Sequence, residues 1–138
     1  MIVTKTIKIK SKGETDIIDI TPDVTDALKA SKLKDGIVNV FVSGATGGIT
    51  TVEYEPGLVE DLKAAFEKIA PRRGEYAHNV KWGDGNGFSH VRASLLGCSF
   101  TAPFSKGKMM LGTWQQIIFI DFDNRPRSRE IIVQVIGE

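Results

Sequence analysis

Residues 108–122 read KMMLGTWQQIIFIDF, and this segment decides the fold because similar segments lie on both sides of it. SFTAPF precedes it at 99–104, and RSREIIVQVI follows it at 127–136. All three are rich in the β-branched and aromatic residues that favour strands. Gly112 marks a bend in the middle segment, and the turn sequence at 123–126 (DNRP) separates it from the last one. The pattern predicts three consecutive antiparallel strands.

The N-terminal half adds more strands and two helices. Alternating or β-branched runs predict strands at 3–10, 16–20, 37–42 and 49–53. A first helix is expected to begin at Thr21-Pro22-Asp23, with Thr21 as its cap, and to end at Gly36. A second helix follows Glu55-Pro56-Gly57 and ends at Pro71, with apolar residues at helical spacing: Leu58, Leu62, Ala65, Phe66 and Ile69.

The fold class follows from the balance of these elements. Residues 72–88 form a long polar loop with four glycines, and loops of this length in compact domains are more often functional than idle. Residues 89–96 (SHVRASLL) form a short helix or a strand, because periodicity alone does not decide. Strands outnumber helices. We therefore expect an α+β protein, a mostly antiparallel β-sandwich flanked by two or three helices, as a single domain over residues 1–138.

Composition and charge exclude several classes of protein. The chain is 41% hydrophobic and 25% charged with a formal net charge of +1, so no global field attracts nucleic acid or an anionic membrane. Cys98 is the only cysteine, which excludes an internal disulfide. No apolar run reaches the roughly 18 residues of a membrane span, and the N-terminus lacks a signal-peptide pattern. We expect a cytoplasmic protein that binds neither nucleic acid nor membrane.

Four polar residues near the glycine-rich loop form the principal candidate site: His78, Asp84, Asn86 and His90. Two histidines and a carboxylate could hold a divalent metal, Mg²⁺ or Zn²⁺, with an open position for catalysis. The glycines would let backbone N–H groups approach a phosphate closely. The alternative is that Asp84 and Asn86 are turn formers and that the histidines make local hydrogen bonds.

Arg92 and Ser94 extend this candidate site. If the segment is a strand, Arg92 shares a face with His90 and could stabilise a departing pyrophosphate group. The alternative for Arg92 is an ion pair at the surface or between subunits. Ser94 would add a hydroxyl donor.

Two tryptophans and a glutamine complete the list of candidate ligand contacts. Trp82 lies in the glycine-rich loop, where an aromatic ligand could stack on its ring. Trp114 and Gln115 are neighbours on a predicted strand, so one of them points inward. Trp114 in the core is the default, because an indole buries a large area. An inward Gln115 would need a polar partner and could bind ligand.

Three further features are given structural interpretations. Residues 43–48 (SGATGG) lack the Gly-Lys-Ser/Thr ending of a P-loop, so they are interpreted as a flexible turn that could form a pocket wall. The arginines at 72, 73, 125, 127 and 129 are expected to be solvated. Cys98 is expected to pack and not to act as a nucleophile.

Several blocks of the second half resemble the YjbQ-like family. They are Asp84-Gly85-Asn86, residues 89–97 (SHVRASLLG), residues 112–117 (GTWQQI) and residues 123–127 (DNRPR), and the spacing between them fits. The resemblance extends over nearly the whole chain. It implies a compact β-sandwich with helices, commonly assembled as a homotrimer. Some relatives are described as having a secondary thiamine-phosphate synthase activity, in which a thiazole phosphate displaces pyrophosphate from a pyrimidine pyrophosphate.

The chain departs from the family pattern at two positions. Many relatives carry a histidine at the position of Gly44, and another at the position of Phe88 that forms a His-x-His pair with His90. His78 matches a further family histidine, and Glu53 matches an acidic position of the family. If the family's histidines bind metal or transfer protons, these changes imply that this branch has lost half of the set.

Two functional hypotheses follow from the residues and the resemblance. The first is an enzyme on small phosphorylated metabolites, resembling thiamine-phosphate synthase, in which the candidate acid–base or ligand residues are His90, Asp84, His78 and Glu53. Its candidate phosphate and ligand contacts are Asn86, Arg92, Ser94, Gln115 and Trp82. The alternative is a non-catalytic trimeric protein in which the same cluster holds a metal or small ligand, and the changes at Gly44 and Phe88 favour it.

Overall fold

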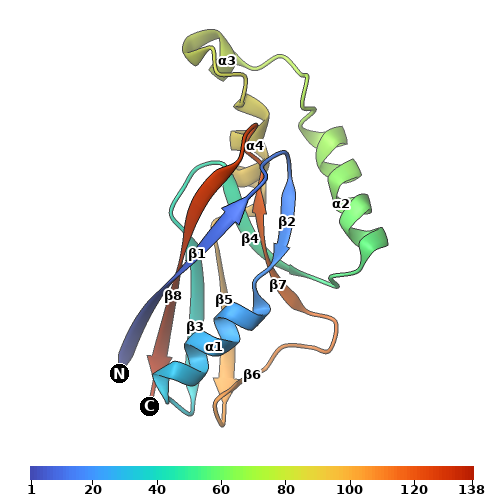
Figure 1. The fold of residues 1–138 in the computed structure, drawn as a ribbon. Coiled ribbons are helices and arrows are strands. Elements are labelled where there is room, and N and C mark those ends of the chain that lie inside the picture. The colour runs from blue at the N-terminus through green and yellow to red at the C-terminus, as the bar shows by residue number, and fades with distance from the viewer.

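Two antiparallel sheets form the framework of the protein, in a computed structural model that describes residues 1–138 (Figure 1). The larger sheet has the order β1-β8-β3-β5-β6, with β1 (Ile2–Ser11), β8 (Arg127–Gly137), β3 (Gly36–Val42), β5 (Ser99–Ser105) and β6 (Lys108–Met109). The smaller sheet has the order β2-β7-β4, with β2 (Asp16–Asp19), β7 (Gln116–Asp121) and β4 (Gly47–Val52). Every strand pair is antiparallel, so the predicted α+β class and antiparallel character are confirmed.

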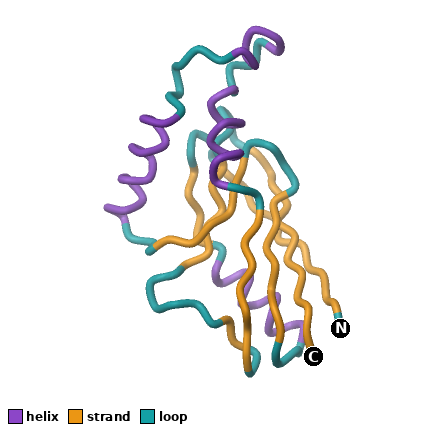
Figure 2. The backbone as a smooth tube through the Cα atoms, turned by 180° about the vertical axis from the view of Figure 1, so that it is seen from behind, coloured by secondary structure: helices purple, strands orange, loops and turns teal.

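Four helices accompany the sheets, one more than the upper limit of the prediction: α1 (Thr21–Ser31), α2 (Pro56–Ile69), α3 (Ala77–Trp82) and α4 (Gly87–Leu96). α1 packs against the lower half of the large sheet, whereas α2 and α4 flank the small sheet (Figure 1). α3 projects at one end of the molecule, and both termini lie together at the opposite end (Figure 2). None of the helices has the length and apolar character that crossing a membrane requires.

Strand β7 links the two halves of the hydrophobic core. Ile117 and Phe119 point toward the large sheet and α1, whereas Ile118 and Ile120 point toward α2 and α4. All four are fully buried, because side chains alternate along a strand and β7 is covered on both faces. The result is three layers: large sheet, small sheet and helices. The last layer positions the candidate site.

Helix α2 buries fewer of its regularly spaced apolar residues than the sequence predicts. Phe66 is buried and meets Phe122 edge-on, with ring centroids 4.8 Å apart. Leu62 packs beside them, whereas Ala65 and Ile69 are exposed. Only part of the apolar face of α2 therefore contacts the small sheet.

The predicted strand at 108–122 is interrupted. β6 ends at Met109 and β7 begins at Gln116, so the intervening residues form a loop. The Gln115 Oε1 accepts a hydrogen bond from the Gly112 N–H, and the Gln116 Nε2 donates one to the Thr113 carbonyl. These local bonds replace strand pairing. Trp114 is consequently 69% exposed, and its assignment to the core is wrong.

Helix α1 also begins and ends differently from the prediction. Thr21 is inside the helix, and its hydroxyl accepts a hydrogen bond from the Ile117 N–H of β7, so it ties the helix to the small sheet and does not cap it. The helix ends at Ser31 with Lys32 in the left-handed conformation, and Gly36 already belongs to β3.

Gly13 and Gly83 have similar backbone conformations but different surroundings, so alanine substitutions at the two positions test how closely neighbouring backbone packs against Gly13. Their φ angles are +73° and +71°. A Cβ at Gly13 would overlap the carbonyl of Arg125, whereas a Cβ at Gly83 meets nothing within 4 Å. We expect Gly83→Ala to lower the free energy of unfolding by about 1 kcal/mol and Gly13→Ala by about 3 kcal/mol. Urea denaturation measures both, and equal losses would contradict the expectation.

Candidate functional site

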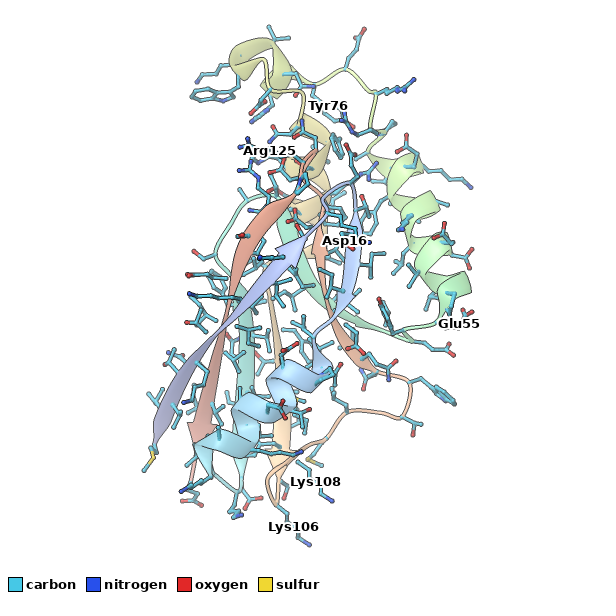
Figure 3. All side chains as sticks on the ribbon, in the orientation of Figure 1. Asp16, Glu55, Tyr76, Lys106, Lys108 and Arg125 are labelled. Carbon is cyan, nitrogen blue, oxygen red and sulfur yellow. The ribbon has the colours of Figure 1, made fainter.

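The candidate site lies where α3 and α4 meet the turn between β7 and β8. Figure 3 marks this end of the molecule by Tyr76 and Arg125, whereas Lys106 and Lys108 lie at the opposite end. The predicted loop at 72–88 contains α3, and residues 89–96 are helical within α4. Asn86 occupies the position before the first turn of α4, and glycines with left-handed φ angles, Gly83 and Gly85, reverse the chain between the two helices.

The two histidines of the chain are stacked. The rings of His78 from α3 and His90 from α4 have centroids 4.4 Å apart and planes inclined by 38°. The His78 Nδ1 lies 3.7 Å from the Asp84 Oδ1. The chain reversal after α3 therefore brings together three residues that the sequence singles out.

Asn86 connects this pair to the β7–β8 turn. Its side chain is nearly buried, and its Nδ2 donates a hydrogen bond of 3.3 Å to the Asp123 Oδ1. The Asn86 Oδ1 and the His78 Nδ1 are buried and have no hydrogen-bond partner in the chain. Such atoms are rare in folded proteins because an unpaired buried polar atom costs free energy. Both atoms are therefore unpaired polar groups inside the site.

His90 is held in its neutral form. Burial lowers the pKa of His90, and the neighbouring His78 lowers it further. The carboxylates of Asp123 and Asp84 raise the pKa of His90 but do not outweigh the other two effects. Because an ordinary histidine has a pKa of about 6.5, His90 is neutral at pH 7 and able to accept a proton.

A pocket of about 270 Å³ opens beside His90. On one side it is lined by the outer face of α4 and the residues that follow, including Ser94 and Cys98. On the other side it is lined by Gly44 and Ala45 of the turn between β3 and β4 and by Gly47 at the start of β4, so the predicted pocket wall is confirmed. Cys98 is exposed here, and the expectation that it packs is wrong. The Ser94 hydroxyl donates to the His90 carbonyl at 2.8 Å.

Arg92 lies outside this site. In a helix, residues two apart face different sides, so the orientation expected from a strand does not occur. The Arg92 side chain is only 4% exposed, and its guanidinium donates to the Ala70 carbonyl, the Thr15 hydroxyl and the Glu67 carboxylate. Arg92 therefore holds α2 and α4 together through an ion pair within the chain.

Phe88 also faces away from His90. Its ring is buried beneath two guanidinium groups, with the Arg72 and Arg92 carbons 4.6 Å and 4.9 Å from the ring centroid. A residue at this position does not reach the pocket beside His90. Of the two departures from the family pattern, only Gly44 lies in that pocket.

The remaining candidates are dispersed. Glu53 is exposed immediately after β4, and Gln115 forms the local turn bond described above. Trp82 is 65% exposed at the end of α3, with the Lys81 amino group 5.3 Å from its ring. None of the three lines the pocket beside His90.

The geometry does not support the predicted metal centre. The structure contains no group of three or more histidine, cysteine, aspartate or glutamate side chains that could hold a metal ion. His78 and Asp84 approach each other, but the stacked ring of His90 does not complete a set of three ligands.

Sequence reasoning missed a buried ion-pair network beneath the site. Asp121 and Asp123 are 0% and 1% exposed. The Arg129 Nε and Nη2 bind the two Asp121 carboxylate oxygens at 2.8 Å and 3.0 Å, and the Arg127 Nη2 lies 2.7 Å from the Asp123 carboxylate. The expectation of solvated charge is therefore wrong for Arg127 and Arg129.

The network also fixes the charges of its members. The hydrogen bond to Asp121 raises the pKa of Arg129, so this arginine is permanently cationic. Burial opposes ionisation of Asp123, but bonds from the Asn124 N–H, Asn86 and Arg127 outweigh it and lower the Asp123 pKa. The sequence did contain a signal for this network. Two aspartates two residues apart (121 and 123) precede the turn, and two arginines two residues apart (127 and 129) follow it. Residues two apart in an extended segment share a face, so the pattern indicates two facing pairs of opposite charge.

Comparison with known proteins gives a consistent result. The family model described as "UPF0047 protein YjbQ-like" matches residues 5–138. A UPF0047 protein of Methanothermobacter thermautotrophicus is 39% identical over 137 residues, which cover 99% of this chain and 94% of that protein. A UPF0047 protein of Methanocaldococcus jannaschii is 38% identical over 132 residues, which cover 95% of this chain and 92% of that protein.

Two crystal structures share the whole architecture. A YbjQ-like protein of unknown function from Sulfolobus solfataricus is 30% identical and superposes with a TM-score of 0.95, covering 100% of this chain and 99% of that one. A protein of the YjbQ/UPF0047 family from Clostridium acetobutylicum is 36% identical with a TM-score of 0.87, covering 96% of this chain and 99% of that one.

Proposed function

The chain belongs to the YjbQ-like UPF0047 family, and on that premise we propose that it is an enzyme acting on small phosphorylated metabolites, with His90 as the residue that transfers a proton. The observation that carries the proposal is the stacked histidine pair beside a pocket, in which burial keeps His90 neutral. A neutral imidazole at the edge of a pocket is the usual form of a general base near pH 7.

The neighbouring residues have positioning roles in this proposal. His78 lies against the His90 ring and limits its orientation, and Asp84 lies within 3.7 Å of the His78 Nδ1. Asn86 donates a hydrogen bond to Asp123 and so links this end of α4 to the β7–β8 turn. The pocket volume of about 270 Å³ lies just below the usual range for small-molecule sites, which favours a small metabolite.

Thiamine-phosphate formation is the first reaction to test, because the family resemblance implies it. In this reaction the thiazole nitrogen donates its lone pair to the methylene carbon of the pyrimidine. The bond from that carbon to the pyrophosphate oxygen breaks, and pyrophosphate leaves with the electron pair. The role proposed for His90 is to exchange a proton with the polar groups of the substrate during this transfer.

The test is incubation of the purified protein with the pyrimidine pyrophosphate, the thiazole phosphate and Mg²⁺, the usual counterion of pyrophosphate. Thiamine phosphate is then quantified by chromatography. Product above the protein-free blank, and absent with a His90→Gln variant, would support the proposal. Equal product from both proteins, or none from either, would contradict it for this reaction.

A second candidate is the non-catalytic oligomeric binding protein, and the outer face of the large sheet favours it. Ile2, Ile136 and Ile37 lie in one register across β1, β8 and β3, and are 64%, 36% and 42% exposed. Phe41 is exposed on the same face. An apolar row of this kind is typical of a subunit contact, and the homotrimer is the assembly we propose. A trimeric mass by light scattering without turnover would favour this candidate.

A further inference from the structure

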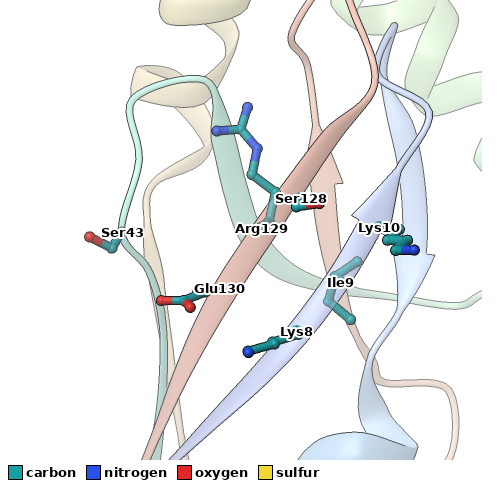
Figure 4. Close-up of a pocket in the computed structure, with 7 residues that line it drawn as sticks. All are labelled: Lys8, Ile9, Lys10, Ser43, Ser128, Arg129 and Glu130. Atoms are coloured by element: carbon teal, nitrogen blue, oxygen red, sulfur yellow. The ribbon is translucent and has the colours of Figure 1, made fainter.

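A cleft opens where β3 separates from β8. β8 pairs with β1 as far as Arg127, but it pairs with β3 only as far as Ile131. Beyond this point the chain leaves β3 through Ser43 and crosses to β4, so one edge of β8 faces a loop in place of a strand. The cleft has a volume of about 810 Å³ and is lined by residues of β1, β8 and the β3–β4 loop: Lys8, Ile9, Lys10, Ser128, Arg129, Glu130 and Ser43. Figure 4 shows these residues.

Arg129 presents a free nitrogen to this cleft. Its Nε and Nη2 bind Asp121, and Nη2 also donates to the Thr46 hydroxyl at 2.6 Å. The Nη1 makes no hydrogen bond, and a Cβ built on Gly44 would lie 3.5 Å from it. The guanidinium extends from β8 into the space bounded by the loop (Figure 4). Two anchored nitrogens thus fix the direction in which the third one points.

The charge of the cleft favours an anion. Lys8 and Lys10 join Arg129 in its lining, and Glu130, opposite Lys8 in the strand register, is its one carboxylate. Asp121 already compensates the charge of Arg129, so the two lysines against Glu130 leave an excess of one positive charge. The Ser43 hydroxyl adds a further donor. Arg129 reaches the cleft from one face of the β1–β8 pair and the two lysines from the other, so guanidinium, ammonium and hydroxyl groups that line it match the acceptor oxygens of a phosphoryl group.

We propose that this cleft binds the phosphoryl group of a small metabolite, with the Arg129 Nη1 as its anchor and Lys8 and Ser43 as additional donors. The anion site rests on the cleft alone. Its connection to chemistry rests on the proposed function: the β3–β4 loop lines this cleft with Ser43 and lines the pocket beside His90 with Gly44. A phosphate held here would direct the rest of the molecule across that loop toward His90.

Gly44 offers a matched pair of variants that test the site without breaking the ion pair of Arg129. Gly44→Asp places a carboxylate beside Nη1, where it competes with an anion. Gly44→Ala adds only a Cβ, at an ordinary contact distance of 3.5 Å. The difference between the two variants isolates the carboxylate. A second pair compares Lys8→Glu in the cleft with Lys108→Glu, which lies at the far end of the molecule (Figure 3).

Isothermal titration calorimetry with inorganic phosphate measures the binding. We expect saturable binding by the wild type, a loss of about tenfold or more in affinity for Gly44→Asp relative to Gly44→Ala, and several-fold weaker binding for Lys8→Glu. Lys108→Glu should retain the wild-type affinity. Glycerol phosphate should compete with inorganic phosphate. No saturable binding, equal affinities for the two Gly44 variants, or no competition would each overturn the proposal.

The outcome separates this inference from the proposed function. Calorimetry detects phosphate without any turnover. Binding that depends on Gly44 and Lys8, in a protein that forms no product, would retain the anion site and contradict the enzyme. Product formation that depends on His90 but is unchanged by Gly44→Asp would retain the enzyme and contradict the anion site.

Discussion

Under the proposed function, His90→Gln is expected to lower kcat/KM for thiamine-phosphate formation by about 10²- to 10⁴-fold, the usual contribution of a positioned proton-transfer group. Glutamine retains a polar side chain of similar reach but has no group that accepts a proton near pH 7. His90 is only partly buried and makes no side-chain hydrogen bond that supports the fold. The loss should therefore appear in activity, with the far-ultraviolet circular dichroism and the midpoint of thermal unfolding nearly unchanged.

Two companion variants sharpen this comparison. Val91→Gln introduces the same side chain at the neighbouring position, which is 40% exposed and does not line the pocket, so its activity should stay near the wild-type value. His78→Gln removes the ring stacked on His90 and should cost less than His90→Gln, about tenfold, because it disturbs only positioning. A His90→Gln loss no larger than that of Val91→Gln would exclude His90 as the proton-transfer group.

Asp121→Asn is expected to lower the free energy of unfolding by about 3–5 kcal/mol, the range measured when one partner of a buried ion pair is removed. Asp121 is fully buried and binds two nitrogens of Arg129, whose side chain is 15% exposed. Its carboxylate also accepts a hydrogen bond from Ser11. Asparagine retains the shape but leaves the guanidinium with Asp123, 3.5 Å away, as its remaining carboxylate partner. Urea denaturation at neutral pH measures the change.

The double variant tests whether the cause is the unpaired charge. Asp121→Asn combined with Arg129→Gln removes both charges, so it should be less destabilised than the sum of the two single changes. Asp26→Asn on the exposed side of α1 is the control and should change stability by less than about 0.5 kcal/mol. If the double variant lost as much stability as the two single variants together, Asp121 and Arg129 would have no interaction energy, and the expectation would be contradicted.

The sequence predicted best those elements that depend on residues close together along the chain. The strands at 37–42, 49–53 and 127–136 match β3, β4 and β8 within a few residues, because their patterns depend on neighbours along the chain. The loop that separates β6 from β7 was missed, since side-chain bonds from Gln115 and Gln116 form it. Periodicity could not decide whether residues 89–96 form a helix or a strand. The expected position of Arg92 beside His90 assumed a strand, and it is wrong because the segment is helical.

The same distinction applies to the candidate site. His78, Asp84 and His90 lie within thirteen residues, so a single chain reversal brings them together, and their selection from sequence needed only local reasoning. Arg129 depends on contacts between the two sheets. Its partner Asp121 lies on β7 of the small sheet, whereas Arg129 lies on β8 of the large one. The Asp-x-Asp and Arg-x-Arg spacings point to such a pair, but the packing of the two sheets decides that Asp121 is the partner of Arg129.

The histidine pair is the central claim, and nuclear magnetic resonance tests it most directly because the chain contains only two histidines. The imidazole C–H signals are followed as the pH is varied, and the His78→Gln variant assigns them. We predict that His90 titrates below the ordinary value of about 6.5, and that its midpoint rises in His78→Gln because a neighbouring charge is removed. A His90 midpoint at or above 6.5 would contradict the claim, since burial and the neighbouring His78 would then not favour the neutral imidazole.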